Sequence, residues 1–189
     1  MTSAASPSTF TELGLIPELL ARLTELEYTQ PTPIQAKAIP SILAGSDLIA
    51  GANTGSGKTA TFALPILQKI SQGALKRDTK GNYVSALILV PTRELATQVA
   101  NNVKSYSAHF NGAIKTVAVF GGVSVNTQMQ ALRGGADIIV ATPGRLLDLI
   151  SSNAIKLDKV NTLVLDEADR MLSLGFTEEL ANLLALMPA

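Results

Sequence analysis

The stretch Ala52-Asn53-Thr54-Gly55-Ser56-Gly57-Lys58-Thr59 is the most informative part of this sequence. It follows a short apolar run, residues 47–50, and precedes a segment whose apolar residues recur at helical spacing. Strand, tight loop and helix in that order are the context of a phosphate-binding loop. Gly55 and Gly57 let successive backbone N–H groups crowd around phosphate oxygens, and the start of the helix adds its positive end.

The residues that close this loop have the chemistry of a nucleotide site. Lys58 is placed to reach the β- and γ-phosphates, and Thr59 to offer its hydroxyl to Mg²⁺. The strict pattern begins with Gly, whereas Ala52 stands there in this chain, so the match is to the looser form that accepts Ala. The alternative is a glycine-rich turn between strand and helix that binds nothing.

Composition limits the class of protein. A chain of 189 residues can form one domain with a core, and 47% hydrophobic against 16% charged residues excludes a disordered chain. Fifteen basic residues balance fifteen acidic ones, so nucleic-acid binding would need a local surface. The absence of cysteine excludes disulfides, thiolate metal sites and cysteine nucleophiles.

The start of the chain carries no targeting signal. Residues 1–8 are small and polar and are predicted to be disordered, and residues 9–189 are predicted to form one domain. No apolar run is long enough to span a bilayer. We therefore expect a soluble cytoplasmic protein without a membrane partner.

Four further apolar runs alternate with helical segments, and they lie at residues 86–90, 116–120, 137–141 and 162–165. Strands that are nearly all apolar and alternate with helices predict an α/β fold with a parallel sheet covered on both faces. Ligands of such sheets gather at the carboxyl ends of the strands. Polar motifs follow these runs: Pro91-Thr92-Arg93-Glu94, Gly121-Gly122, Thr142-Pro143-Gly144-Arg145 and Asp166-Glu167-Ala168-Asp169.

The acidic motif completes a candidate hydrolytic site. Asp166 directly follows four apolar strand residues, where a carboxylate can reach a magnesium ion shared with Thr59. Glu167 is placed to orient or deprotonate the attacking water. An isolated acidic pair at a strand end is more often a helix cap or a solvated loop, but downstream of a phosphate-binding loop it favours nucleoside triphosphate hydrolysis. The predicted catalytic residues are Lys58, Asp166 and Glu167.

The remaining motifs each have a structural alternative. Thr92, Arg93, Thr142 and Arg145 could bind phosphates, as could the N–H groups of the Gly121-Gly122 pair. Alternatively, Arg93 forms an ion pair with Glu94, Arg145 is exposed in the first turn of a helix, and the glycines make turns. The single histidine, His109, is given no role.

Gln35 also has two interpretations. With Thr32 and Pro33 it forms a capping box at the start of a helix. Its amide, which carries a donor and an acceptor, also matches the N6 and N7 edge of adenine. Spacing alone favours the cap.

Taken together, these motifs resemble the first RecA-like domain of DEAD-box RNA helicases, over the whole chain from Phe10 onward. Residues 119–124 and 165–171 are similar to the bacterial RhlE-like branch. The resemblance implies a RecA-like P-loop fold with ATP and Mg²⁺ as cofactors. Glu27 stands where the family usually has Gly, so we expect the turn before Tyr28 to differ.

The resemblance also assigns roles to individual residues. It implies that Phe10, Tyr28 and Gln35 hold adenine, and that Thr59 and Asp166 hold Mg²⁺, partly through water. It implies phosphate contacts along the loop at Ala52, Asn53, Thr54, Gly55, Ser56, Gly57, Lys58 and Thr59. It further implies that Thr92, Arg93, Gly122, Thr142 and Arg145 touch the sugar-phosphate backbone of single-stranded or duplex RNA.

Two parts of the family's architecture are missing from this sequence. One is a strand with a Ser-Ala-Thr motif, which in the family lies between the strand before the P-loop and the strand that ends at Asp166. The other is the second RecA-like domain, which supplies arginine fingers. We therefore expect a fragment that binds adenine nucleotide with little turnover, and that leaves a gap in its sheet or exchanges a strand with another copy. The alternatives are an RNA-clamping or partner-docking module without turnover, and a DNA-directed RecA-like motor.

Overall fold

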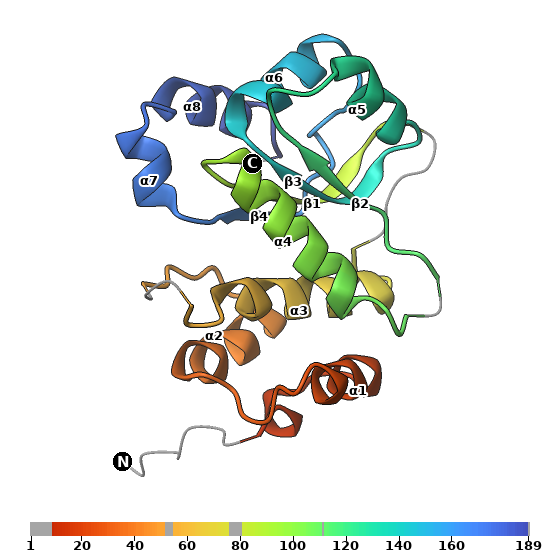
Figure 1. Ribbon diagram of the computed structural model, residues 1–189, viewed down its shortest axis with the longest axis vertical. Coiled ribbons are helices and arrows are strands. Elements are labelled where there is room, and N and C mark those ends of the chain that lie inside the picture. Colours follow the sequence, from red (N-terminus) through yellow and green to blue (C-terminus); the bar gives the residue numbers. More distant parts are fainter. Residues whose placement is uncertain (1–8, 52–54, 76–80, 111, 189) are drawn as a thin grey trace. The chain divides into compact units, whose positions relative to one another are not determined.

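The computed structural model describes residues 9–51, 55–75, 81–110 and 112–188 (Figure 1). The predicted disordered segment, residues 1–8, lies outside the described residues. The chain divides into two compact units. The N-terminal unit comprises Met1–Ala74 and Asn102–Ala113, and the sheet unit comprises Leu75–Asn101 and Ile114–Ala189. Each is considered by itself below.

The N-terminal unit is helical. It contains η1 (Thr11–Leu13), α1 (Pro17–Glu25), α2 (Pro33–Leu43), α3 (Lys58–Ser71) and the last residues of α4 (Arg93–Tyr106). Both α1 and α2 begin with a proline, where the missing N–H costs no helical hydrogen bond. Because proline lacks the N–H of a helical hydrogen bond, the sequence predicts that the helix over residues 34–43 is interrupted or starts afresh at Pro40. This prediction is wrong: α2 continues through Pro40, and Ala44 N–H donates to Pro40 O at 3.0 Å.

The expected strand at residues 47–50 is also wrong. All four residues are exposed and have no regular secondary structure, and Ile49 is 102% exposed. A strand is held by hydrogen bonds to a neighbouring strand, and none of the described strands pairs with this run. The apolar composition of the run was therefore insufficient to make it a strand here.

The backbone conformation of Glu27 differs from the one that we expected. Its φ is +59°, in the left-handed region that glycine adopts without strain. The turn before Tyr28 thus keeps a glycine-type conformation although a glutamate occupies it, which is the opposite of what the loss of the glycine led us to expect.

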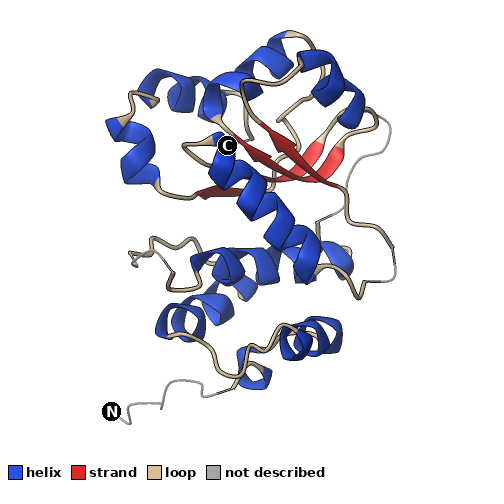
Figure 2. Cartoon of the chain, viewed as in Figure 1, coloured by secondary structure: helices blue, strands red, loops and turns tan. Residues whose placement is uncertain are grey.

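The described residues of the sheet unit form four parallel strands in the order β2-β3-β1-β4. Figure 2 shows these strands in red. They are β1 (Val84–Leu89), β2 (Thr116–Val119), β3 (Ala136–Ala141) and β4 (Thr162–Leu165). The central strands β1 and β3 are buried at every position, so both faces of the sheet are covered, as predicted. β4 is an end strand of this sheet. This agrees with the expectation that the strand which neighbours it in the family is missing from this sequence.

Helices α5 (Val125–Ala131), α6 (Pro143–Ser151), α7 (Ala168–Ser173) and α8 (Thr177–Ala185) complete the unit. Figure 1 shows α5, α6 and α8 along one side of the sheet, where Leu146, Leu149 and Leu183 pack in one apolar core with Leu87 and Ile139 of the strands. No described helix has the length and apolar character needed to cross a membrane.

Candidate functional site

The phosphate-binding loop ends at the start of α3. Gly57 is the residue before the helix and has φ +85°, while Gly55 has φ +81°. Lys58 and Thr59 form the first helical turn, where backbone N–H groups have no helical partner. The Ser56 hydroxyl is buried and has no hydrogen-bond partner among the described residues. Ala52, Asn53 and Thr54 lie outside the described residues.

Gln35 lies against this loop. It is 2% exposed, its Oε1 accepts a hydrogen bond from Thr32 N at 2.9 Å, and its Nε2 donates to Gly57 O at 3.2 Å. The capping box of Thr32 and Gln35 is confirmed, although the Thr32 hydroxyl is buried without a hydrogen bond of good geometry. Thr61 Oγ1 also donates to Gly57 O, at 3.0 Å. The carbonyl that ends the loop is therefore held by two side chains.

Three aromatic side chains gather in the N-terminal unit. The rings of Phe10 and Tyr28 lie 6.4 Å apart, and those of Tyr28 and Tyr106 lie 6.3 Å apart in an edge arrangement. The hydroxyls of Tyr28 and Tyr106 are 3.2 Å apart. Burial and this hydrogen bond raise the pKa of Tyr106. Tyr106 was not among the predicted site residues, and only its helical spacing from Val99 and Val103 marked it as buried.

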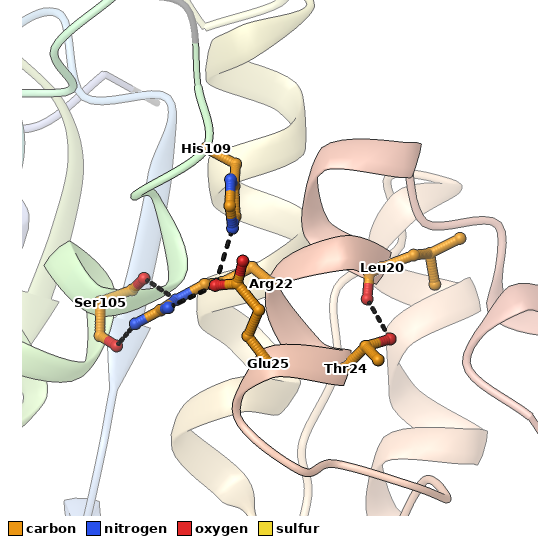
Figure 3. Close-up of polar contacts among 6 residues, drawn as sticks. All are labelled: Leu20, Arg22, Thr24, Glu25, Ser105 and His109. Atoms are coloured by element: carbon orange, nitrogen blue, oxygen red, sulfur yellow. Dashed lines mark hydrogen bonds and ion pairs between the residues drawn. The ribbon is translucent and has the colours of Figure 1, made fainter.

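A polar cluster joins α1 to the end of α4 (Figure 3). Arg22 donates from Nε to Ser105 O at 2.8 Å and from Nη2 to Ser105 Oγ at 2.9 Å. Glu25 Oε2 lies 2.9 Å from His109 Nε2 and 2.8 Å from Arg22 Nη1. The hydrogen bond from His109, and then that from Arg22, lower the pKa of Glu25. His109, for which no role was predicted, thus has a structural one.

In the sheet unit, the four polar motifs lie at one edge. Leu89 of β1 pairs with Ala141 of β3 and with Leu165 of β4, and Val119 of β2 pairs with Ala141. The strands are parallel and their last residues are in register, so the segments that follow them begin side by side. This placement of the motifs is as predicted.

Three of the predicted RNA-contacting residues, Thr92, Arg93 and Arg145, contact other groups of the protein. Arg93 Nε forms an ion pair with Glu94 Oε1 at 2.7 Å, as in the structural alternative, and its Nη1 approaches Gly122, which has φ +83°. The Thr92 hydroxyl accepts a hydrogen bond from Leu95 N at 3.3 Å. Thr142 is the residue before α6 and is half-buried.

Arg145 differs from its structural alternative. Its side chain is only 12% exposed, rather than exposed in the first turn of α6. Its Nη1 donates to Val123 O at 3.0 Å, and its Nε lies 3.6 Å from Asp148 Oδ2. Arg145 therefore holds the segment that follows Gly121 and Gly122.

Gln128 was missed by the sequence analysis. From within α5 it receives a hydrogen bond from Phe120 N at 3.2 Å and donates one to Phe120 O at 2.9 Å. The buried amide thereby fixes the residue before the glycine pair. A glutamine in a helix gives no sequence signal of such a role.

The acidic motif follows β4 without a break. Asp166 N donates to Leu89 O at 3.0 Å, and its side chain is largely buried, with the residue 9% exposed. Glu167 has φ +53° and its Oε2 lies 3.1 Å from Arg170 Nη1. Asp166 belongs to the sheet unit, while Lys58 and Thr59 belong to the N-terminal unit.

The chemistry of the donors suits magnesium. A threonine hydroxyl and a carboxylate are hard oxygen ligands, and Mg²⁺ usually combines one or two protein oxygens with phosphates and water. No group of three or more His, Cys, Asp or Glu side chains in the described part of the chain could hold a metal ion. As types of donor, a threonine hydroxyl and a carboxylate are compatible with an ion that also takes ligands from nucleotide and water.

A pocket of about 320 Å³ lies elsewhere in the sheet unit. Its lining includes Asn82, which precedes β1, and Arg133, which follows α5. None of the predicted site residues lines it.

Comparisons with known proteins agree with this architecture. The family model described as DEAD/DEAH box helicase matches residues 32–189. ATP-dependent RNA helicase DeaD of Escherichia coli (strain K12) is 45% identical over 181 residues, which cover 96% of this chain and 28% of the relative. ATP-dependent RNA helicase CshA of Listeria monocytogenes is 43% identical over 180 residues, 95% of this chain and 33% of the relative.

A solved structure shows the same fold. The crystal structure of a DEAD box protein from Methanococcus jannaschii matches with a TM-score of 0.85 and 37% identity, over 96% of this chain and 47% of that one. The α/β fold with its parallel sheet is therefore RecA-like, as predicted. The chain spans about a third or less of the length of the curated relatives described above.

Proposed function

Because the chain belongs to the DEAD/DEAH box helicase family, we propose that it is the ATP-binding half of an RNA-dependent ATPase that clamps RNA and locally unwinds duplexes. The observation that supports this most directly is the buried Gln35 amide on Gly57 O, which joins the base-reading segment to the phosphate loop inside one unit. Relatives matched over nearly the whole chain are named ATP-dependent RNA helicases.

Gln35 has capacity left for adenine. A primary amide offers two donor hydrogens and two acceptor lone pairs. Thr32 N and Gly57 O use one of each, which leaves one hydrogen on Nε2 and one lone pair on Oε1. Capping and adenine reading are therefore compatible. Tyr28, which is 39% exposed, supplies ring surface for the base, and Phe10, which is buried, packs against the Tyr28 ring.

The phosphates are held by the loop and the start of α3. Backbone N–H groups of residues 52–59 and the Lys58 ammonium neutralise their charge, and the unpartnered Ser56 hydroxyl is available as a further donor. Thr59 and Asp166 would hold Mg²⁺, partly through water; when bound, the ion neutralises charge that develops on the phosphates. Glu167 orients the attacking water and accepts its proton as the bond to the leaving nucleoside diphosphate breaks.

RNA is bound along the carboxyl edge of the sheet. Thr92, Arg93, Gly122, Thr142 and Arg145 contact the sugar-phosphate backbone, with Arg145 also holding the glycine segment in place. Backbone contacts carry no sequence information, so base preference is weak and affinity falls as salt rises. Stimulation of turnover by RNA but not by DNA would separate this function from that of a DNA-directed motor.

The test of hydrolysis is Lys58→Ala in the complete protein. We expect RNA-stimulated phosphate release to fall by about 10²-fold or more, because the ammonium stabilises charge that grows in the transition state. Lys69→Ala, in the last turn of the same helix α3, is the matched control and leaves the rate unchanged. Full turnover by the Lys58 variant would refute the proposal.

The second candidate is an RNA-clamping or partner-docking module without turnover. The close approach of Arg93 to Gly122 favours this second candidate. The contact orders the proposed RNA-binding residues at the carboxyl ends of the strands and involves no residue of the nucleotide loop. If the complete protein binds RNA but releases no phosphate, this candidate replaces the first. In both cases the chain alone is expected to bind adenine nucleotide with little turnover, because arginine fingers contribute about 10³–10⁵ in rate.

Two finer assignments complete the proposal. The partner is a second RecA-like domain of the same protein, which supplies those fingers and the rest of the RNA surface. The branch within the family rests on residues 119–124 and 165–171, which are similar to RhlE-like proteins, whereas the relatives reported above are DeaD and CshA proteins. The complete gene sequence would decide between these branches.

A further inference from the structure

The C-terminal end of α4 is fixed to α1 within the N-terminal unit. The last carbonyls of a helix have no partner inside it. The Arg22 guanidinium binds one of them, Ser105 O, together with the hydroxyl of the same residue, and its positive charge suits the negative end of the helix (Figure 3). Tyr106, the next and last residue of α4, is thereby set in one place.

Tyr106 is turned toward Tyr28 and away from solvent. Tyr106 is 5% exposed, whereas Tyr28 is 39% exposed, so Tyr28 keeps a free surface while Tyr106 lies behind it. Edge-on ring packing at 6.3 Å and the hydroxyl contact of 3.2 Å limit both the tilt and the slide of the Tyr28 ring. Phe10 packs on the same ring at 6.4 Å.

We propose that Tyr106 is a positioning residue for the adenine base, which it does not touch: Tyr106 and the buried Phe10 orient Tyr28, and the exposed face of Tyr28 receives the base. This rests on the proposed function. It adds to that function a determinant of nucleotide affinity that lies outside the motifs of the sequence, at the end of a helix whose first turn carries Arg93.

Tyr106→Phe isolates the effect. Phenylalanine keeps the ring and its packing and removes only the hydroxyl that Tyr28 contacts. A single neutral hydrogen bond corresponds to a change of about two- to tenfold in an equilibrium constant. We expect the dissociation constant of ADP with Mg²⁺ to rise by that factor in the 189-residue chain.

Two probes distinguish positioning from general loosening of the fold. ADP carries the base, whereas inorganic pyrophosphate occupies only the phosphate loop. Calorimetric titration should show weaker ADP binding by Tyr106→Phe and unchanged pyrophosphate binding. Equal loss for both probes, or no loss for either, would overturn the proposal.

Tyr83→Phe is the matched control, because Tyr83 lies in the sheet unit, outside the site. This variant should change neither the affinity for ADP nor that for pyrophosphate.

In a Tyr28→Phe background, Tyr106→Phe should have no further effect on the dissociation constant of ADP, since the hydroxyl contact is already gone. Additive losses would contradict the proposal. If the unaltered chain binds pyrophosphate but not ADP, the proposed adenine site fails, and this inference with it; if the chain binds ADP and Tyr106→Phe binds it equally well, only this inference fails.

Discussion

Gly57 is constrained in two ways at a single position. Its φ of +85° is strained for any residue with a Cβ, and an added Cβ would also collide with the Gln35 amide. Gly55, two residues earlier, has a similar φ of +81°, but no atom of the described residues lies within 4 Å of its added Cβ. A side chain at Gly55 would therefore add backbone strain alone, whereas a side chain at Gly57 would add backbone strain and a clash with Gln35.

We predict that Gly57→Ala destabilises the chain more than Gly55→Ala does. Left-handed strain costs each variant about 1–2 kcal/mol, and the lower entropy of the unfolded chain is the same in both. Displacing Gln35 from Gly57 O adds about 0.5–1.5 kcal/mol to the Gly57 variant alone. Urea unfolding without nucleotide measures the difference, and equal destabilisation would show that the Gln35 contact is unimportant.

We predict that the stability of the chain depends on pH through the carboxyl group of Glu25. Contacts from His109 and then Arg22 lower its pKa from the usual 4.5, so its carboxylate stabilises the folded chain above that pH. The contribution is lost as the pH falls through the lowered folded-state pKa. The melting temperature of Glu25→Gln should be below that of the unaltered chain at neutral pH, and the gap should close in acid.

Glu18 supplies the comparison for this titration. It lies on the same helix α1, is exposed, and has no ion pair among the described residues. Glu18→Gln should leave the melting temperature close to that of the unaltered chain throughout. A gap that persists below the pKa of Glu25 would mean that the glutamate acts by packing and not by charge.

At the scale of elements, Gln128 links α5 to the end of β2. We predict that Gln128→Leu lowers the free energy of unfolding by about 1–3 kcal/mol, since it leaves both backbone groups of Phe120 without their partner. It should also weaken RNA binding, because the Gly121-Gly122 turn follows directly. Gln130→Leu, exposed on the same helix, is the control for both measurements. Unchanged RNA affinity in Gln128→Leu would separate the turn from RNA recognition.

Which motifs share an edge could be predicted from sequence, because apolar runs that alternate with helices leave few arrangements other than a parallel sheet. The capping box at Thr32 and Gln35 could also be predicted, since both partners lie within one turn. The contacts of Tyr106, Gln128 and Arg145 could not be predicted from the sequence. Their partners are a ring hydroxyl or backbone groups outside their own helices, and such contacts have no signature in a sequence.

The failed strand at residues 47–50 has a different cause. Its residues are apolar enough, but a strand also requires a partner, and partners are a property of the sheet and not of the segment. Pro40 is the converse case: a local rule predicted a break, and the surrounding helix α2 overrode it.

At the scale of the whole molecule, β4 is an end strand of the sheet that the described strands form. Asp166 N bonds inward to Leu89 O, and neighbouring residues of a parallel strand alternate in direction, so the backbone groups of Leu165 point away from β1. No described strand pairs with these groups, and Leu165 itself is exposed, which favours pairing with another chain.

We therefore predict concentration-dependent self-association of the 189-residue chain, reduced by Leu165→Lys, which places a charge on that edge. Sedimentation velocity over a range of concentrations measures it. Leu184→Lys, on the exposed surface of α8, tests the alternative that apolar surface alone drives association. Equal reduction by both variants would argue against strand exchange.

Glutamates at 27 and 167 both occupy a backbone conformation that glycine would accept without strain. Glu27 has no proposed catalytic role, so Glu27→Gly is expected to raise the free energy of unfolding by up to about 1 kcal/mol. This value already subtracts the larger conformational entropy of glycine in the unfolded chain. At 167 the same replacement relieves the same strain and removes the carboxylate proposed to prepare water. A laboratory selection for survival at high temperature alone would accept glycine at both sites, whereas selection for growth that depends on ATP turnover would accept it at only one.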